Sequence, residues 1–303
     1  AADGFSGRVT FLTGSEKGSG KTSLLNYALG LLRASGERAA FLGIGFDGER
    51  RGPSTAPRIA CREGEIFVTA ATYLGSTGCW PEVLEVLPGS SALGRLAIVR
   101  ARRDGEVVLV GSERNAYTAH AIALIRSEGW ARTVLVDGAM NRVTQVSAFP
   151  GARFVFAVLA SPGDLERNAA AVRRLAALAR LPCVGIRSDG ELAEVPELDE
   201  HVRAAGLPTP SFAVDGPLTA TSLARVPETA RTIVVDDFTK VFLDLPGIAA
   251  VRRERELAVR AAVEFGGFVV SLRDVSRARF LATLADPGAA EMITFNPYEV
   301  GRA

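Results

Sequence analysis

One feature near the start of the chain constrains the fold most. Residues 8–35 contain an apolar run, VTFL, then a glycine-rich loop, then the stretch SLLNYALGLLR with apolar residues at helical spacing. A short continuous apolar run is typical of a strand that is buried on both faces, and the spacing that follows predicts a helix over 22–35. A buried strand followed directly by a helix favours a parallel sheet that is covered by helices.

The same alternation of strand and helix patterns continues to about residue 185. Further strands are expected at 39–44, 65–70, 95–100, 133–137, 153–160 and 183–186, with helices at 116–128 and 164–179. Asp104-Gly105 lies between two β-like arms and predicts a β-hairpin inserted in the sheet or at its edge. We therefore expect an α/β fold with a mostly parallel sheet flanked by helices.

A polar and acidic stretch, RSDGELAEVPELDE, suggests a domain boundary. With 303 residues the chain is long enough for two domains. We expect a nucleotide-binding domain over 1–186, a linker over 187–200, and a smaller α/β domain over 201–303. The second domain is predicted to have strands near 232–235, 268–272 and 292–295, whereas 254–264 is compatible with either helix or strand.

The loop itself, TGSEKGSGKT at 13–22, has the composition of a phosphate-binding loop. Backbone N–H groups of such a loop and the positive end of the following helix hold nucleotide phosphates. Lys21 would reach the β- and γ-phosphates, and the Thr22 hydroxyl would bind Mg²⁺. The strict pattern begins with glycine where this chain has Ser15. The predicted nucleotide-binding residues are Gly14, Ser15, Glu16, Lys17, Gly18, Ser19, Gly20, Lys21 and Thr22.

Two carboxylates follow predicted strands. Asp137 ends the run TVLVD, and Asp47 stands in GIGFDGER after the strand at 39–44. Because the carboxyl ends of parallel strands meet at one edge of a sheet, Lys21, Asp47 and Asp137 are expected to converge there as the catalytic residues. Thr22, Asp47 and Asp137 are the predicted Mg²⁺ ligands, directly or through water, and Asp47 would position the attacking water or acceptor.

At these residues the chain resembles the P-loop NTPase class that includes dethiobiotin synthetase and the deviant Walker ATPases. The residues that carry the match are Gly14, Ser15, Glu16, Gly20, Lys21 and Thr22. The resemblance covers about the first 50 residues and implies ATP as the nucleotide. The deviant ATPases place a signature lysine five residues before the loop lysine, whereas Lys17 stands four residues before Lys21.

The sequence is similar over more of its length to P-loop proteins that are encoded beside cobalamin-dependent amino-acid aminomutases. The stretches that carry this likeness are GIGFDGER, VDGAMNR, VVDDFTKVFL and the late TFNP. The resemblance implies a companion ATPase of the reactivase type, which uses nucleotide to free a damaged cofactor from its partner enzyme. That partner would be a cobalamin-dependent aminomutase.

Three functions remain open from the sequence. The first is an ATP-dependent maturation or reactivation factor for a partner enzyme. The second is a small-molecule kinase or ligase that resembles dethiobiotin synthetase, since phosphoryl transfer needs little beyond positioning and charge neutralisation. The third is a nucleotide-binding sensor that does not hydrolyse its ligand. Candidate acceptor-side residues for the second function are Lys17, Ser112, Arg114, Asn115, Asn141 and Arg142.

Composition argues against several other functions. There are 35 basic and 34 acidic residues, so a nucleic-acid partner is not expected. Three cysteines without a CxxC pair fit a reducing cytoplasm, and no apolar run approaches the roughly 18 residues of a membrane span. His120 and His201 have no second ligand at metal spacing. Asp236, Asp237 and Lys240 in DDFTK are interpreted first as a solvated strand end, with a charged site as the alternative, and a homodimer is compatible with the class.

Overall fold

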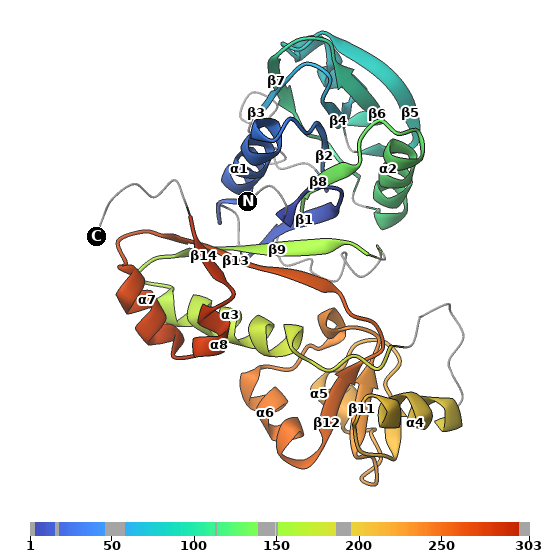
Figure 1. The fold of residues 1–303 in the computed structure, drawn as a ribbon, viewed down its shortest axis with the longest axis vertical. Helices are drawn as coiled ribbons and strands as arrows, with labels where there is room; N and C mark the ends of the chain where they lie inside the picture. The colour runs from blue at the N-terminus through green and yellow to red at the C-terminus, as the bar shows by residue number, and fades with distance from the viewer. Residues whose placement is uncertain are drawn as a thin grey trace. The chain divides into compact units, whose positions relative to one another are not determined.

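The chain folds as an α/β protein (Figure 1). The computed structural model describes residues 4–15, 18–45, 58–91, 93–112, 114–138, 149, 151–185 and 195–296. Within these ranges no helix combines the length and the apolar composition that a bilayer crossing requires.

A nine-stranded sheet organises the first part of the chain, with the strand order β14-β13-β9-β1-β8-β2-β4-β6-β5. Its strands are β1 (Val9–Gly14), β2 (Ala39–Gly43), β4 (Ile66–Ala70), β5 (Pro81–Ser91), β6 (Gly94–Ala101), β8 (Thr133–Asp137), β9 (Arg153–Ala160), β13 (Glu264–Leu272) and β14 (Ile293–Phe295). The associated helices are α1 (Lys21–Ala34), η3 (Ala71–Ser76) and α2 (Asn115–Ser127), and a separate antiparallel pair is formed by β3 (Arg58–Cys61) and β7 (Gly105–Val108).

The middle of the large sheet is parallel, as the alternating pattern predicts. β9, β1, β8, β2 and β4 run in the same direction, and Leu12 of β1 is in register with Asp137 of β8 and Val155 of β9. The carboxyl ends of these strands therefore meet at one edge. β6 and β5 add to β4 in antiparallel fashion.

The hairpin predicted at Asp104-Gly105 is wrong. β6 pairs with β4 and β5, and its hairpin partner β5 joins it between Ser91 and Gly94, whereas β7 pairs with β3. Gly105 is needed for a different reason: a Cβ on it would lie 2.5 Å from the carbonyl carbon of Gly78. A close backbone approach and a tight turn both require glycine, and the sequence pattern does not separate the two.

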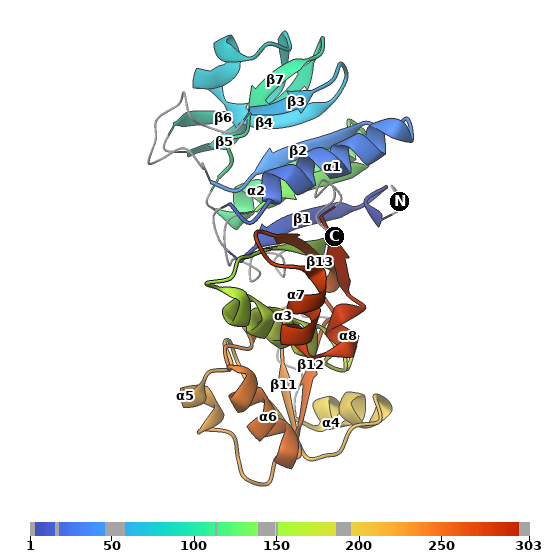
Figure 2. The same ribbon diagram turned by 90° about the vertical axis from the view of Figure 1, so that its left-hand side faces the viewer.

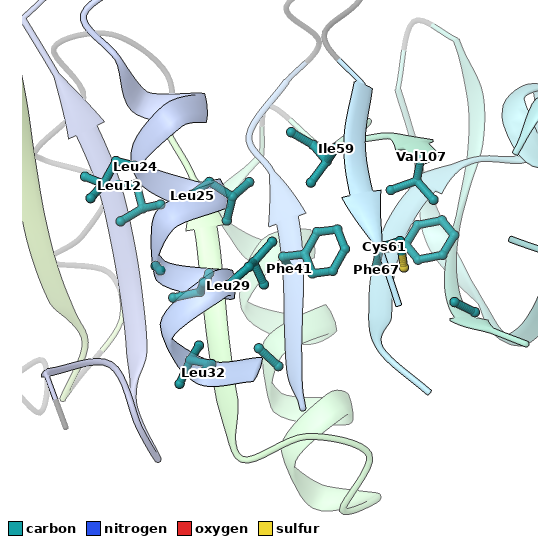
Figure 3. Packing of buried hydrophobic residues seen from close by; sticks show 14 of the residues in the cluster. Leu12, Leu24, Leu25, Leu29, Leu32, Phe41, Ile59, Cys61, Phe67 and Val107 are labelled. Carbon is teal, nitrogen blue, oxygen red and sulfur yellow. The ribbon is translucent and has the colours of Figure 1, made fainter. Parts of the chain in front are cut away.

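Helices α1 and α2 cover opposite faces of the parallel strands (Figures 1 and 2). The buried leucines of α1 point toward β1 and β2, and the packing extends to Phe67 and to the β3–β7 pair (Figure 3). Phe41 and Phe67 stack at 6.2 Å between ring centroids. This cluster also explains the low reactivity expected of two cysteines, because burial raises the pKa of the Cys61 and Cys79 thiols.

The described chain divides into two compact units by its contacts. The first unit comprises 1–159, 266–271 and 294–300, and the second comprises 160–265, 272–293 and 301–303. Strands β13 and β14 thus contribute mainly to the first unit, although they come late in the chain. The predicted linker, 187–200, lies mostly outside the described residues, so that boundary stays a prediction.

The second unit has a three-stranded parallel sheet with the order β10-β11-β12. Its elements are α3 (Leu165–Ala179), α4 (Val195–Ala204), β10 (Ser211–Ala213), α5 (Ala220–Leu223), β11 (Thr232–Val235), η5 (Phe238–Lys240), α6 (Leu245–Glu254), β12 (Glu256–Val259), α7 (Arg277–Leu284) and α8 (Pro287–Ala290). The ambiguous region 254–264 contains β12 and the start of β13. The strand expected at 183–186 is not formed as such: Cys183 makes a single parallel bridge to Val259, and residue 186 lies outside the described ranges.

Candidate functional site

The loop between β1 and α1 is closely packed at its start. Gly14 ends β1 opposite Ala157 of β9, and the Ser15 N–H donates to the Ala157 carbonyl over 3.1 Å. A Cβ on Gly14 would lie 2.2 Å from the Ser19 Oγ and 3.2 Å from the Lys21 Cγ. Glycine at position 14 therefore lets the loop fold back over the end of its own strand.

Two further glycines set the path of this loop. Gly18 and Gly20 have φ of 83° and 91°, values that side-chain-bearing residues rarely adopt. Gly20 is also the N-cap of α1, with its carbonyl accepting the Leu24 N–H over 2.9 Å. The glycines that the sequence motif requires thus have a conformational role at 18 and 20 and a packing role at 14.

Among the described residues, no side chain accepts a hydrogen bond from the N-cap position of α1. No side chain caps the helix, and its first turn contains no acidic residue. The first N–H groups of any helix lack intrahelical partners, and the helix dipole makes this end positive. As far as the described residues show, the N-terminal end of α1 is therefore suited to binding an anion.

Two side chains stand at this end with the chemistry that phosphates need. Lys21 and Thr22 are the first residues of α1, and both are half-buried. The Lys21 Nζ lies 3.5 Å from the Oγ of Ser19, a side chain that is only 1% exposed. Ser15 adds a buried hydroxyl for which the described part of the chain supplies no hydrogen-bond partner. Hydroxyls and an ammonium group thus gather around the uncapped helix end.

Asp137 occupies the strand next to β1. It ends β8, in register with Leu12 of β1 and Gly43 of β2, and it is half-buried. Its carbonyl accepts the Ile44 N–H over 2.9 Å, which ties the end of β2 to the end of β8. The carboxylate therefore comes from the same edge of the sheet as the loop, as the sequence predicts.

A neighbouring turn completes this edge. The Gly45 N–H donates to the Ser112 carbonyl over 3.3 Å, and the Gly111 N–H donates to the Gly45 carbonyl over 2.9 Å. The Ser112 Oγ accepts the N–H of Arg114, which is the N-cap of α2. Like α1, α2 has no side-chain cap and no acidic residue in its first turn. Two of the acceptor-side candidates, Ser112 and Arg114, are thus located beside the end of β2.

A cavity adjoins the loop on the side of β13 and β14. It is a small depression that is open to solvent, with about 30 Å³ of space for water-sized molecules, and Ser19 and Gly20 form part of its wall. The remaining lining residues are Ser23, Leu24, Tyr27, Val269, Ser271, Thr294 and Asn296. The Asn296 Nδ2 donates to the Ser271 Oγ over 2.9 Å. The wall is rich in hydroxyl and amide groups and contains no charged side chain among these residues.

Several predicted site residues lie outside the described ranges. These are Glu16 and Lys17 of the loop, Asp47 after β2, and the acceptor-side candidates Asn141 and Arg142. Their roles stay predictions. Among the residues that are described, no group of three or more His, Cys, Asp and Glu side chains is arranged to hold a metal ion.

Apart from Ser19 and Gly20, the residues that line the cavity are not predicted from the sequence. Tyr27 fits the helical pattern of α1 like any core-facing aromatic residue. Ser271 of β13 and Asn296, which directly follows β14, are more than 240 residues away along the chain. The only local signal was the TFNP stretch, which contains Thr294 and Asn296. Comparison of the chain with protein-family models, curated proteins and solved structures found no match.

Proposed function

We propose that the protein is an ATP-binding P-loop ATPase that requires Mg²⁺ and acts as a maturation or reactivation factor for a partner enzyme. One observation carries the proposal, the arrangement at the N-terminal end of α1. This helix follows two glycines with positive φ and has neither a side-chain cap nor an acidic residue in its first turn. Its first residues, Lys21 and Thr22, lie at the edge of the sheet where the neighbouring strand β8 ends in Asp137. A helix end of this kind, with a lysine and hydroxyls around it, suits a polyphosphate.

Each residue of this site has its own proposed role in binding nucleotide and Mg²⁺. The ammonium group of Lys21 would neutralise charge on the β- and γ-phosphates, which is the main requirement of phosphoryl transfer. Thr22 and Asp137 are the described residues that would hold Mg²⁺, with Asp47 as the third predicted ligand. The buried Ser15 hydroxyl, which has no hydrogen-bond partner among the described residues, is a feature that fits a bound phosphate chain. When bound, Mg²⁺ would offset charge on the phosphate oxygens.

The nature of the partner rests on the sequence resemblance alone. We propose an enzyme of the cobalamin-dependent aminomutase type, and neither nucleic acid nor membrane as a partner. Turnover that rises when such an enzyme is added would support the reactivation role, and light scattering with and without ATP would test for a homodimer.

A second candidate is an ATP-dependent kinase or ligase for a small molecule. The observation in its favour is the cavity lined by Ser23, Tyr27 and Asn296, which shares Ser19 and Gly20 with the loop. A small acceptor in this cavity would stand next to the phosphates. Such an enzyme should turn over ATP only when its acceptor is supplied.

The test is ATP binding by calorimetry and ATP hydrolysis with Mg²⁺, for the parent protein and for Lys21→Ala. Lys240→Ala is the matched control, because it removes a lysine of the second unit. We expect Lys21→Ala to lower binding or turnover by about 100-fold or more, as for other charge-stabilising groups in catalytic sites, with Lys240→Ala unchanged. Equal binding in the parent and Lys21→Ala, or no binding by the parent, would contradict the proposal.

The same experiment separates the two candidates. Hydrolysis by the protein alone favours the maturation ATPase. Binding without hydrolysis means that a component is missing. ATP turnover is then measured with added small carboxylates and amines and, separately, with an added partner enzyme, which distinguishes an acceptor from a protein activator.

A further inference from the structure

The carboxyl edge of the small sheet in the second unit holds a charged pair. β11 ends at Val235 and β12 at Val259, which are in register, so Asp236 and Arg260 follow side by side. The ladder continues past the strands, because the Arg260 N–H donates to the Val235 carbonyl over 2.8 Å and the Ala261 N–H donates to the Asp236 carbonyl over 3.0 Å. The backbone of this pair is thus fixed by the sheet.

The two side chains point to the face of the sheet that α4 covers. Val234 and Ala258 pack with Leu198 and Val202 of α4. Residues two apart along a strand share a face, so Asp236 and Arg260 project to the same side. The Cys183 Sγ donates to the Arg260 carbonyl over 3.4 Å and holds this residue from the neighbouring segment.

Arg260 is buried without adequate compensation for its charge. Its side chain is 6% exposed, yet its nearest carboxylate oxygen, the Asp236 Oδ1, is 3.8 Å from the Nε, and Asp236 itself is 40% exposed. Among the residues that the structure describes, the buried Nε has no hydrogen-bond partner. Removing a guanidinium from water costs free energy that is recovered only through close ion pairs and hydrogen bonds. Native proteins satisfy nearly all buried donors with protein groups, ordered water or a bound ion, so this guanidinium is suited to a partner from outside the chain.

A second buried donor at this edge is also unsatisfied. Thr239 lies in η5, and its buried Oγ1 finds no hydrogen-bond partner in the described ranges, whereas its N–H donates to the Asp237 Oδ1 over 2.7 Å. Asp237 is 5% exposed, so the interpretation of DDFTK as a solvated strand end is wrong for this residue, whereas Asp236 and Lys240 are partly exposed.

We propose that this edge is a second binding site, for a small molecule that carries an oxyanion, either a carboxylate or a phosphate. The ligand's oxyanion satisfies Arg260, whose planar fork of N–H groups matches two oxygens of such a group. The exposed carboxylate of Asp236 accepts from a hydroxyl or ammonium group of the same molecule. The site lies at the carboxyl ends of parallel strands, where open α/β sheets bind ligands, and it does not depend on the nucleotide proposal.

The test uses calorimetric titration with two probes, inorganic phosphate and succinate, on a Lys21→Ala background that removes the lysine of the first-unit loop. We expect binding of at least one probe, and a loss of about 10- to 100-fold in Arg260→Met, as when a charged hydrogen-bond donor is removed. Arg231→Met is the matched control: it removes one positive charge from the opposite end of β11 and should change affinity by less than about twofold. The probe that binds identifies the class of oxyanion.

Arg260→Lys guards against a folding defect. It keeps the charge but loses the fork, so it should also weaken binding while the protein remains folded. The proposal is overturned if neither probe binds the Lys21→Ala protein, or if Arg260→Met and Arg260→Lys bind both probes as the parent does. Because every arm is carried out without Lys21, a failure here says nothing about the nucleotide site.

Discussion

Two arginine–carboxylate pairs, one in each unit, differ in how completely they are satisfied. In the first unit Arg33 binds Glu65 through two hydrogen bonds of 2.7 Å, and Glu65 also accepts the Arg62 N–H. In the second unit the corresponding separation between Arg260 and Asp236 is 3.8 Å, with no hydrogen bond. The first pair completes the packing of α1 against the sheet region, whereas the second leaves donors available to a ligand.

The helix ends repeat this contrast. Side chains cap α5, α6, α7 and α8 in the second unit, whereas α1 and α2 in the first unit begin without a cap or an acidic residue in the first turn. α3 of the second unit also lacks a side-chain cap, but its first turn contains Glu166. A cap makes a helix end self-sufficient, and an uncapped end can bind an anion instead. Polar groups that lack partners at the carboxyl edges of parallel sheets are therefore the main evidence for function in both units.

The largest effect is expected when the satisfied pair is broken. Glu65→Ala leaves Arg33, whose side chain is 14% exposed, without its carboxylate partner, and we expect a loss of about 3 kcal/mol in the free energy of unfolding. Thermal and urea unfolding would measure it. Glu82→Ala is the control, since Glu82 pairs with Arg100 and Arg102 at a more exposed position and should cost about 1 kcal/mol or less. Equal losses in the two variants would contradict the structural role of the Arg33–Glu65 pair.

Gly20→Ala tests whether the loop is built for a left-handed residue. With φ of 91°, alanine at this position should cost about 1–2 kcal/mol, and its Cβ would lie 3.4 Å from the Ser271 Oγ. Nucleotide affinity should fall with it, because the first turn of α1 shifts.

Gly30→Ala is the control on the same helix. Nothing lies within 4 Å of a Cβ there, so helix propensity alone predicts a gain of about 0.5–1 kcal/mol. A gain in both variants would mean that Gly20 serves no conformational purpose.

The sequence predicted the parts of the fold that depend on local patterns. The bounds of β8, β9 and β11 match their apolar runs, and α1 begins within one residue of the expected position. A buried strand and an amphipathic helix each carry their own signal over a few residues. The order of elements was enough to infer the parallel sheet and to bring Asp137 beside the loop.

Long-range pairing could not be inferred in the same way. β13 and β14 extend the first sheet from the end of the chain, and Asp104-Gly105 looks like a turn although Gly105 is needed where two backbones meet. The Arg260 site was missed because an arginine after a short strand carries no local sign of burial. It is revealed only by the register and side-chain alternation of β11 and β12 and by the burial of the Arg260 side chain.

Arg260→Met tests the poorly paired arginine of the second unit. Replacing a poorly paired buried charge by an apolar side chain should leave stability within about 1 kcal/mol of the parent, or raise it. Unfolding by urea, followed for Arg260→Met and Glu65→Ala together, would show whether the two arginines differ as described. A loss of about 3 kcal/mol or more for Arg260→Met would make Arg260 a structural residue like Arg33.

Removing the side-chain cap of a helix in the second unit should lower stability modestly and leave nucleotide binding unchanged. The Asp244 carboxylate accepts the Gly247 N–H over 2.8 Å at the start of α6. Asp244→Ala should cost about 1 kcal/mol, whereas Asp244→Asn keeps an acceptor and should cost less. Melting temperature and ATP affinity, measured on the same samples, would separate the two effects. A change in ATP affinity would contradict the distinction between capped and uncapped ends.

The smallest effect is expected at Asp164, a carboxylate that accepts several hydrogen bonds. It concerns the pH dependence of the protein's stability. Burial alone would raise its pKa, but hydrogen bonds from the Ser161 N–H (2.7 Å) and the Asn168 Nδ2 (3.0 Å) outweigh burial and hold the pKa below its usual range. Such a group stabilises the fold above its unfolded pKa of about 4, and this contribution is lost as the pH falls through the folded pKa. Melting temperatures between neutral and acidic pH should therefore fall less steeply for Asp164→Asn than for the parent, because the variant has no proton to take up at this position. Parallel curves would mean that the hydrogen bonds to Asp164 do not distinguish its charged form from its neutral one.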